Sequence, residues 1–380
     1  MKNNVNLNSL IKQGEYAKLL RPLLPEEAFV PDLNKVFILG INVAILLLGW
    51  GTASYLDRWP WYFLWLFLPL ALIMGNSIMA LMFITHELMH CKTIKNRFLR
   101  KIVNQLGFMM TWLPPTFWNV LHNRQHHPNP NGIKDPDRRY LSEQPNSWGK
   151  LSQEWFVPSS EIKSLSLILG TCNVLGVYIF RNLISVILFN DELLGYGPAP
   201  FKVSNKERKV IIIELFIIFS IHMSIVTFLQ FHPVKLLLGY FLPIWIGYTG
   251  IMSYLYTEHM LCPMSETDDC LVTTLSVRVP RIFDYLHVNF SYHTEHHIFP
   301  TINSDYYPLV QQLLIEKFSE KLNLIPIQEA WCLMLQTPIH YKDETTFTDT
   351  SGTQLVTCPQ LNYSTKIVEN KENSDNQLGR

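Results

Sequence analysis

Four long apolar blocks dominate the chain, and polar segments separate them. The blocks cover residues about 33–54, 61–85, 210–231 and 236–257. Each has the roughly 20 residues that a helix needs to cross about 30 Å of hydrocarbon. Short connections join the first block to the second and the third to the fourth. This pattern predicts an all-α integral membrane protein with four transmembrane helices in two hairpins.

A fifth apolar block, residues about 164–189, contains Asn173, Arg181 and Asn182. An arginine in the middle of a bilayer is costly. If both hairpins enter the membrane from the same side, the chain between them must cross it an even number of times. We therefore predict that this block is an interfacial amphipathic helix or a re-entrant pair of helices.

The other segments are polar. Residues 1–32 form a polar N-terminal segment, and residues 33–341 form the membrane domain. Residues 342–380 are rich in Thr, Ser, Asn, Asp and Glu and have no apolar period, which predicts a disordered tail.

The charges predict an orientation. The sequence has 31 Lys+Arg and 31 Asp+Glu, so it lacks the broad basic field typical of nucleic-acid binding. Only Arg58 and Lys235 lie in the two short connections, and nearly all other basic residues lie at the opposite ends of the blocks. The positive-inside rule places those ends, both termini and any site between them on the cytoplasmic side. The six cysteines form no C-x-x-C pair, which is typical of reduced thiols.

Nine of the 13 histidines cluster at the cytoplasmic ends of the blocks or in the polar segments beside them. These nine are His86, His90, His122, His126, His127, His259, His293, His296 and His297. Residues four apart on a helix share a face, so His86 and His90 can converge on one ion, and His122 and His126 can do the same. The adjacent His127 would point toward a second ion. His293 and His296 are also one turn apart, with His297 beside them.

The number of imidazoles predicts two metal ions with open positions, because four ligands close a structural zinc site. Imidazole suits Fe, Zn, Cu and Ni, so the ligand type leaves the metal open. Nearby carboxylates can orient the imidazoles from behind; the candidates are Glu87, Asp135, Asp137, Glu258 and Glu295. An ordinary structural role suits His222, His232 and His340, and His287 is left open.

The three clusters resemble the signature of the membrane fatty-acid desaturase and hydroxylase superfamily, H-x3/4-H, H-x2/3-H-H and H/Q-x2/3-H-H. The resemblance extends from about residue 33 to 313. N-F-S-Y-H-T-E-H-H-I-F-P at 289–300 is similar to the third box of acyl-lipid desaturases, whereas H-E-L-M-H, H-N-R-Q-H-H and Y-T-E-H are similar to alkane ω-hydroxylases. Leu255 stands where the hydroxylase pattern has Asn, and Asn289 is a candidate substitute or a backbone-capping residue.

The resemblance implies a pair of iron ions (Fe2+) that activates O2 and removes hydrogen from an unactivated alkyl chain drawn from the bilayer. It favours desaturation of a lipid acyl chain. Hydroxylation of an alkyl chain, or of a carotenoid by a hydroxylase or ketolase, is the alternative on the same scaffold. The sequence has no haem-binding H-P-G-G, Cys-rich cluster motif or dinucleotide fingerprint, so we expect a separate electron carrier, such as a ferredoxin, a rubredoxin or a b-type cytochrome.

Three further readings are open. The segment His86-Glu87-Leu88-Met89-His90 also fits H-E-x-x-H of zinc metalloproteases, with Glu87 as general base, but this leaves the other two clusters unexplained. A metal-binding transporter or sensor would need more ionisable residues within the membrane than the four apolar blocks contain. The basic stretch 92–101 is a docking surface for an acidic carrier or, as we favour, an anchor at lipid headgroups.

Overall fold

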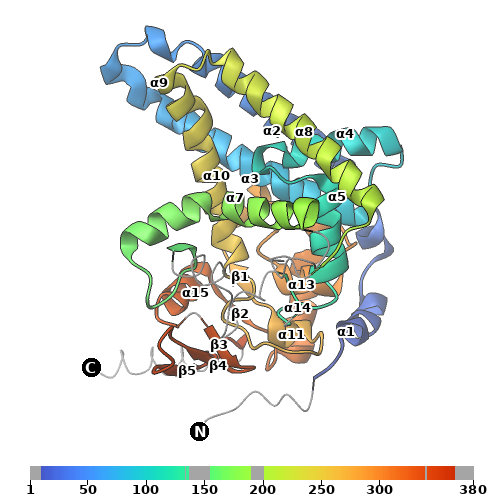
Figure 1. Cartoon of the computed structure of the whole chain (residues 1–380). Coiled ribbons are helices and arrows are strands. Elements are labelled where there is room, and N and C mark those ends of the chain that lie inside the picture. The colour runs from blue at the N-terminus through green and yellow to red at the C-terminus, as the bar shows by residue number, and fades with distance from the viewer. Residues whose placement is uncertain (1–9, 133, 137–154, 190–200, 339, 364–380) are drawn as a thin grey trace, which may run out of the picture.

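A computed structural model of the 380-residue chain describes residues 10–132, 134–136, 155–189, 201–338 and 340–363. These parts are mostly helical, as predicted. Long helices form one end of the molecule, and short helices with small strands form a cap at the other end (Figure 1). The cap contains both the first helix and the last strand.

The four predicted spans correspond to long helices. They are α2 (Asn34–Ala53), α3 (Leu68–Cys91) with the preceding 3-10 helix η5 (Trp61–Phe67), α8 (Asn205–Phe228), and the continuous run of α9 (Pro233–Leu236), the π-helix η10 (Leu237–Phe241) and α10 (Leu242–Leu255). Each is long and apolar enough to cross a membrane. The helix α3 does not end at the predicted residue 85, since it continues through His86 and His90.

The two hairpins meet at their outer turns and along their helices. The ammonium of Lys235 lies 3.0 Å from a carboxylate oxygen of Asp57 in η4 (Leu56–Arg58), so an ion pair joins the turns. The helices α3 and α10 approach closely at Gly247, where a Cβ atom would lie only 2.9 Å from Cβ of Ile78. Small residues at such crossings let two apolar helices pack backbone to backbone.

The fifth apolar block forms one helix, α7 (Ser164–Leu188), and it is one of five described helices that are long and apolar enough to span. In Figure 1, α7 runs across α10 rather than alongside it. After this helix the chain is again beside the second histidine cluster, because Arg124 donates to the carbonyl of Lys202 at 3.0 Å. By length and composition α7 could also cross a membrane, so its interfacial position stays a prediction.

A short helical segment connects α3 to the second histidine cluster. It contains α4 (Arg97–Phe108), η6 (Met109–Thr111), α5 (Pro115–Trp118) and the π-helix η7 (Asn119–His126). Carbonyls at the end of a helix need donors. His222 of α8 lies 2.9 Å from the carbonyl of Met109, and Tyr248 of α10 donates to that of Met110 at 3.1 Å.

The cap is built from short elements. They are α1 (Gln13–Leu20), η2 (Arg21–Leu23), η3 (Glu26–Phe29), α11 (Cys270–Thr273), β1 (Ser276–Arg278), α12 (Arg281–Leu286), α13 (His293–Ile298), η11 (Ser304–Tyr306), α14 (Tyr307–Phe318), β2 (Leu324–Pro326) and α15 (Ile327–Met334). The strands β1 and β2 are parallel. Within the predicted polar N-terminal segment, Tyr16 and Leu20 of α1 are fully buried in the cap.

The predicted disordered tail is wrong for residues 342–363. Strands β3 (His340–Asp343), β4 (Thr346–Thr348) and β5 (Leu355–Thr357) form an antiparallel sheet in the order β3-β4-β5. Such short strands have no apolar period of their own, and the sheet is stabilised by burial of Tyr341 and Phe347 against the cap. Residues 364–380 lie outside the described part of the chain.

Candidate metal centre

Eight histidines form two compact groups of four where the long helices meet the cap. Within each group, one nitrogen from every ring lies within 4.8 Å of the others. The first group is His86, His90, His122 and His296, and the second is His126, His259, His293 and His297. The ninth predicted residue, His127, lies beside the first group, with its Nε2 3.1 Å from that of both His122 and His296. The structure thus brings all nine predicted histidines together.

The histidines of the second sequence cluster do not fall into the metal groups that were predicted for them. His122 and His126 were expected to share an ion, but they lie in different groups. The reason is the π-helix η7, in which the N–H of His127 donates to the carbonyl of His122 at 3.0 Å. A π-helix joins residues five apart, so His127 and not His126 lies on the same side as His122.

The third cluster shows a second difference. His293 shares its group with His297, four residues away on α13, and their Nε2 atoms are 3.0 Å apart. His296 faces the first group instead. On a helix with 3.6 residues per turn, a residue four positions on is offset by about 40° and one three positions on by about 60° in the opposite sense, so His297 and His296 face different sides of His293. The expected pairing of His293 with His296 is therefore wrong.

Hydrogen-bond partners at Nδ1, the ring nitrogen that points away from the other histidines, hold several of the rings in one orientation. Nδ1 of His259 donates to the carbonyl of Thr273 at 2.9 Å, and Nδ1 of His126 lies 3.0 Å from a carboxylate oxygen of Asp135. Nδ1 of His296 bonds to the hydroxyl of Tyr307 at 3.0 Å. A ring that donates from Nδ1 presents the lone pair of Nε2 at its front. Such rear partners are typical of metal-binding histidines.

The ring of His259 therefore presents the lone pair of Nε2 to its neighbours. Nε2 of His259 lies 2.7 Å from Nε2 of His293, although Nδ1 of His259 already carries its proton. Lone pairs this close repel unless a cation or a proton lies between them. The second group consequently fits a metal ion, and its four imidazole donors suit iron as well as zinc, copper or nickel.

Burial keeps these rings neutral. It lowers the pKa of His122, His127, His296 and His297 well below the ordinary value of 6.5, and the other histidines nearby lower it further. Neutral imidazole is the form that binds metal, so protons compete weakly with a metal here at neutral pH.

The carboxylates that were expected to orient the rings have several different roles. Asp135 contacts His126, and a carboxylate oxygen of Glu258 lies 3.4 Å from Nδ1 of His293. Glu295 accepts from Ser276 at 2.6 Å, and burial raises the pKa of this carboxyl to about 6. Asp137 lies outside the described residues.

Glu87 and Asn289 both point to the loop at Ser304. The two carboxylate oxygens of Glu87 accept from the backbone and side chain of Ser304, and Lys35 lies 3.8 Å away. A carboxylate held in this way is not placed as the general base that the metalloprotease reading requires. Asn289 has a left-handed backbone with φ of 57° and donates to the carbonyl of Ser304 at 2.9 Å.

Two histidines outside the groups have protein partners at both nitrogens. His222 lies between Tyr240 and the Met109 carbonyl, and His287 lies between Tyr254 and Asn76.

Spacing alone could not identify Thr273 and Tyr307, the Nδ1 partners of His259 and His296, because they come from other segments of the chain.

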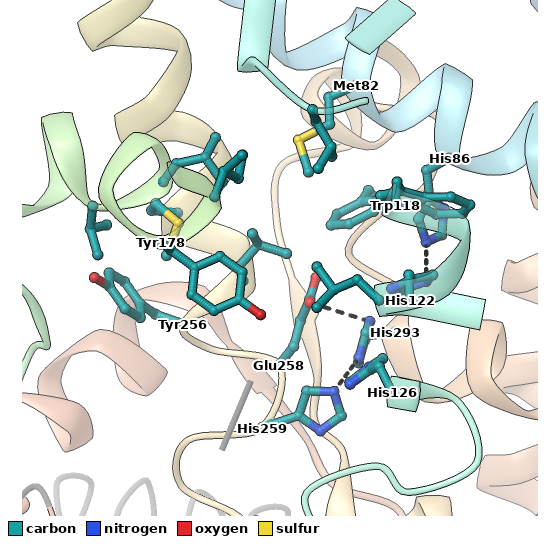
Figure 2. Close-up of a pocket in the computed structure, with 18 residues that line it drawn as sticks. Met82, His86, Trp118, His122, His126, Tyr178, Tyr256, Glu258, His259 and His293 are labelled. Carbon is teal, nitrogen blue, oxygen red and sulfur yellow. Dashed lines mark hydrogen bonds and ion pairs between the residues drawn. The ribbon is translucent and has the colours of Figure 1, made fainter. Parts of the chain in front are cut away.

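A mostly apolar cavity of about 120 Å³ opens in front of the histidines. Met82, Leu113, Val174, Ile179, Met252 and Leu255 are among the side chains that line it. His86, His122, His126, His259 and His293 also line it, and Figure 2 shows them on the side opposite Tyr178 and Tyr256. The cavity therefore joins both histidine groups to the space between α7 and α10.

Comparison with family models gives a match over most of the chain. A family model described as fatty acid desaturase matches residues 59–327, which include all nine histidines. No curated protein matches the chain.

Proposed function

The chain belongs to the fatty acid desaturase family, and on this premise we propose that it is a membrane-bound, non-haem di-iron oxidoreductase that desaturates a lipid acyl chain. The observation that carries the proposal is that both groups of four histidines contribute side chains to the lining of one mostly apolar cavity between the long helices. A long alkyl chain is the substrate that fits such a lining.

The nine histidines would hold two iron ions. The first group would hold one ion, with His127 beside it, and the second group would hold the other. When bound, the iron pair supplies the redox chemistry for an unactivated C–H bond, which no side chain can supply. Asp135, Thr273 and Tyr307 keep the imidazoles oriented toward the metals from behind.

The cavity positions the alkyl chain and excludes water. Side chains such as Val174, Met252 and Leu255 hold the chain by apolar contact, and their position limits which carbon lies next to the histidines. In the proposed reaction, dioxygen takes the two hydrogens of the alkyl chain, together with two electrons from the carrier and two protons from the solvent. It leaves as two molecules of water.

We further propose four membrane spans with α7 at the interface, and a cytoplasmic site. In support, the chain begins α2 and ends α10 at the cap, whereas Asp57 and Lys235 pair at the far end. The electron donor would be a separate carrier such as a ferredoxin, a rubredoxin or a b-type cytochrome. The basic helix α4 exposes Phe98 and Leu99, which favours contact with lipid headgroups over carrier docking at this helix.

Metal analysis of detergent-purified protein tests the proposal. We expect about two irons per chain, and a loss of iron when one histidine of each cluster, His86, His126 or His296, is changed to alanine. His222→Ala is the control, because this histidine lies outside both groups.

The products of expressing cells test the reaction. A new double bond in the lipid profile supports desaturation, and a new hydroxyl group identifies the hydroxylase alternative. One zinc per chain, lost with His86 but kept in the His126 and His296 variants, would overturn the di-iron proposal.

A further inference from the structure

The C-terminal sheet lies outside the family match but contacts a loop of the metal centre. Tyr341 of β3 is 4% exposed, and its ring packs on Phe347 of β4 with centroids 4.6 Å apart. The sheet is tied to the loop after His259 by its backbone as well, because Met264 donates to the carbonyl of Glu344 at 2.8 Å. A buried and well-packed tyrosine keeps its hydroxyl in a defined place.

That hydroxyl reaches the turn that begins at His259. It donates to the carbonyl of Cys262 at 2.7 Å, and the carbonyl of Met260 is the next nearest acceptor at 3.3 Å. The N–H of Cys262 in turn donates to the carbonyl of His259 at 3.0 Å. Two hydrogen bonds through Cys262 therefore connect the tyrosine to the backbone of a second-group histidine.

Asn131 reaches the same carbonyl beside that hydroxyl, since its amide nitrogen lies 3.4 Å from the Tyr341 oxygen. It is fully buried with φ of 56°, and its side-chain amide donates to the carbonyls of Cys262 at 3.0 Å and Pro263 at 2.8 Å. Its backbone N–H donates to Asp135, whose carboxylate holds His126. The Cys262 carbonyl thus joins the loops that carry two histidines of the second group.

We propose that Tyr341 is a positioning residue for the second histidine group, which makes the C-terminal sheet part of the metal centre. The proposal rests on the two-metal function above. It predicts an asymmetry, because His86 and His90 of the first group are held by the long helix α3 and do not depend on this loop. Loss of the hydroxyl should weaken the second metal and leave the first unchanged.

The test uses full-length protein in detergent, loaded with 57Fe. Tyr341→Phe keeps the ring and removes the hydroxyl. We expect one iron per chain to be lost to a chelator about 10 times more readily than in the wild type, the lower end of the range for direct partners of metal ligands, because Tyr341 acts through the loop backbone. One Mössbauer component should change and the other should not. Tyr363→Phe is the control, since that ring lies at the far side of β2, beside Arg278.

A second variant keeps the test independent of the folding of the first. Asn131→Gly removes the amide donors to the same carbonyl, and glycine accepts the positive φ. We expect loss of the same iron and the same spectral component. Measurements are made on the monodisperse fraction of each variant.

The outcomes separate the two proposals. Wild-type protein without two irons overturns the proposed function. Wild-type protein with two irons, and variants that release both at the wild-type rate or lose both in parallel, would overturn only the role of Tyr341. A lower melting temperature with unchanged iron would likewise show a merely structural role.

Discussion

Asp135 offers the sharpest test of how this centre holds its metals. The side chain is fully buried, and it accepts from Nδ1 of His126 at 3.0 Å and from the backbone N–H of Asn131 at 2.9 Å. Asp135→Asn keeps the shape but removes the charge and replaces one acceptor oxygen with a donor. Both donors bond the same oxygen, Oδ2, and Oδ1 lies 3.2 Å from Nδ1 of His126. An asparagine can keep both bonds through its amide oxygen, but the bonds lose the charge and the new NH2 group faces Nδ1 of His126.

The size of the effect follows from the lost charge. A hydrogen bond to a charged group contributes about 1.5–3 kcal/mol and a neutral one about 0.5–1.5 kcal/mol, so weakening the two bonds costs about 2 kcal/mol in total. A loss of about 2 kcal/mol corresponds to roughly 30-fold weaker binding of the second metal. This lies within the 10 to 100-fold range that is usual for outer partners of metal ligands, stated here as an order of magnitude.

The assay is competition for iron between the protein and a chelator of known affinity. Asp57→Asn is the matched control, because Asp57 pairs with Lys235 in the outer turns, far from the histidines. We expect about 30-fold weaker retention of one iron in Asp135→Asn and no change in the control. Equal retention in Asp135→Asn and the wild type would refute the idea that Asp135 orients His126 for metal binding.

Three further predictions follow from burial and packing. Iron affinity, corrected for the chelator, should fall less than tenfold between pH 7.5 and 5.5, because burial lowers the pKa of His122, His296 and His297 and protons compete only at lower pH. A histidine of ordinary pKa would lower the affinity about tenfold at pH 5.5. A steep loss of affinity near pH 6.5 would therefore count against the buried site. Lys35→Met leaves the buried carboxylate of Glu87 without its cation and should lower the free energy of unfolding by about 3 kcal/mol, seen as a lower melting temperature, whereas an unchanged one would contradict the ion pair. Val174→Trp fills the cavity and should abolish product while iron content stays at the wild-type level; undiminished product would exclude this cavity as the substrate site.

Local pattern alone predicted the helical architecture and the candidate metal ligands, whereas the di-iron chemistry was implied by the resemblance and stays a prediction. Apolar blocks of span length became α2, α3 and α8, because burial of a long apolar run does not depend on its neighbours. Ligand spacing selected all nine histidines that the structure brings together, because repeated clusters have a periodicity that can be read within one segment.

The division of those histidines could not be read from the sequence. Spacing predicted His122 with His126, whereas the π-helix puts His127 on that side and leaves His126 to the other group. Helix type depends on what the surrounding segments leave room for, so tertiary packing decides it.

The supports of the centre were decided by the tertiary structure as well. Thr273, Tyr307 and Tyr341 reach the site from segments far along the chain, and no periodicity marks them. The C-terminal sheet is the clearest case, since a tail with no apolar pattern becomes ordered by burying Tyr341 and Phe347 in a cap built by other residues. The sequence by itself determined which residues can bind metal, and only the fold decided which of them act together, because that depends on contacts between segments that no local pattern encodes.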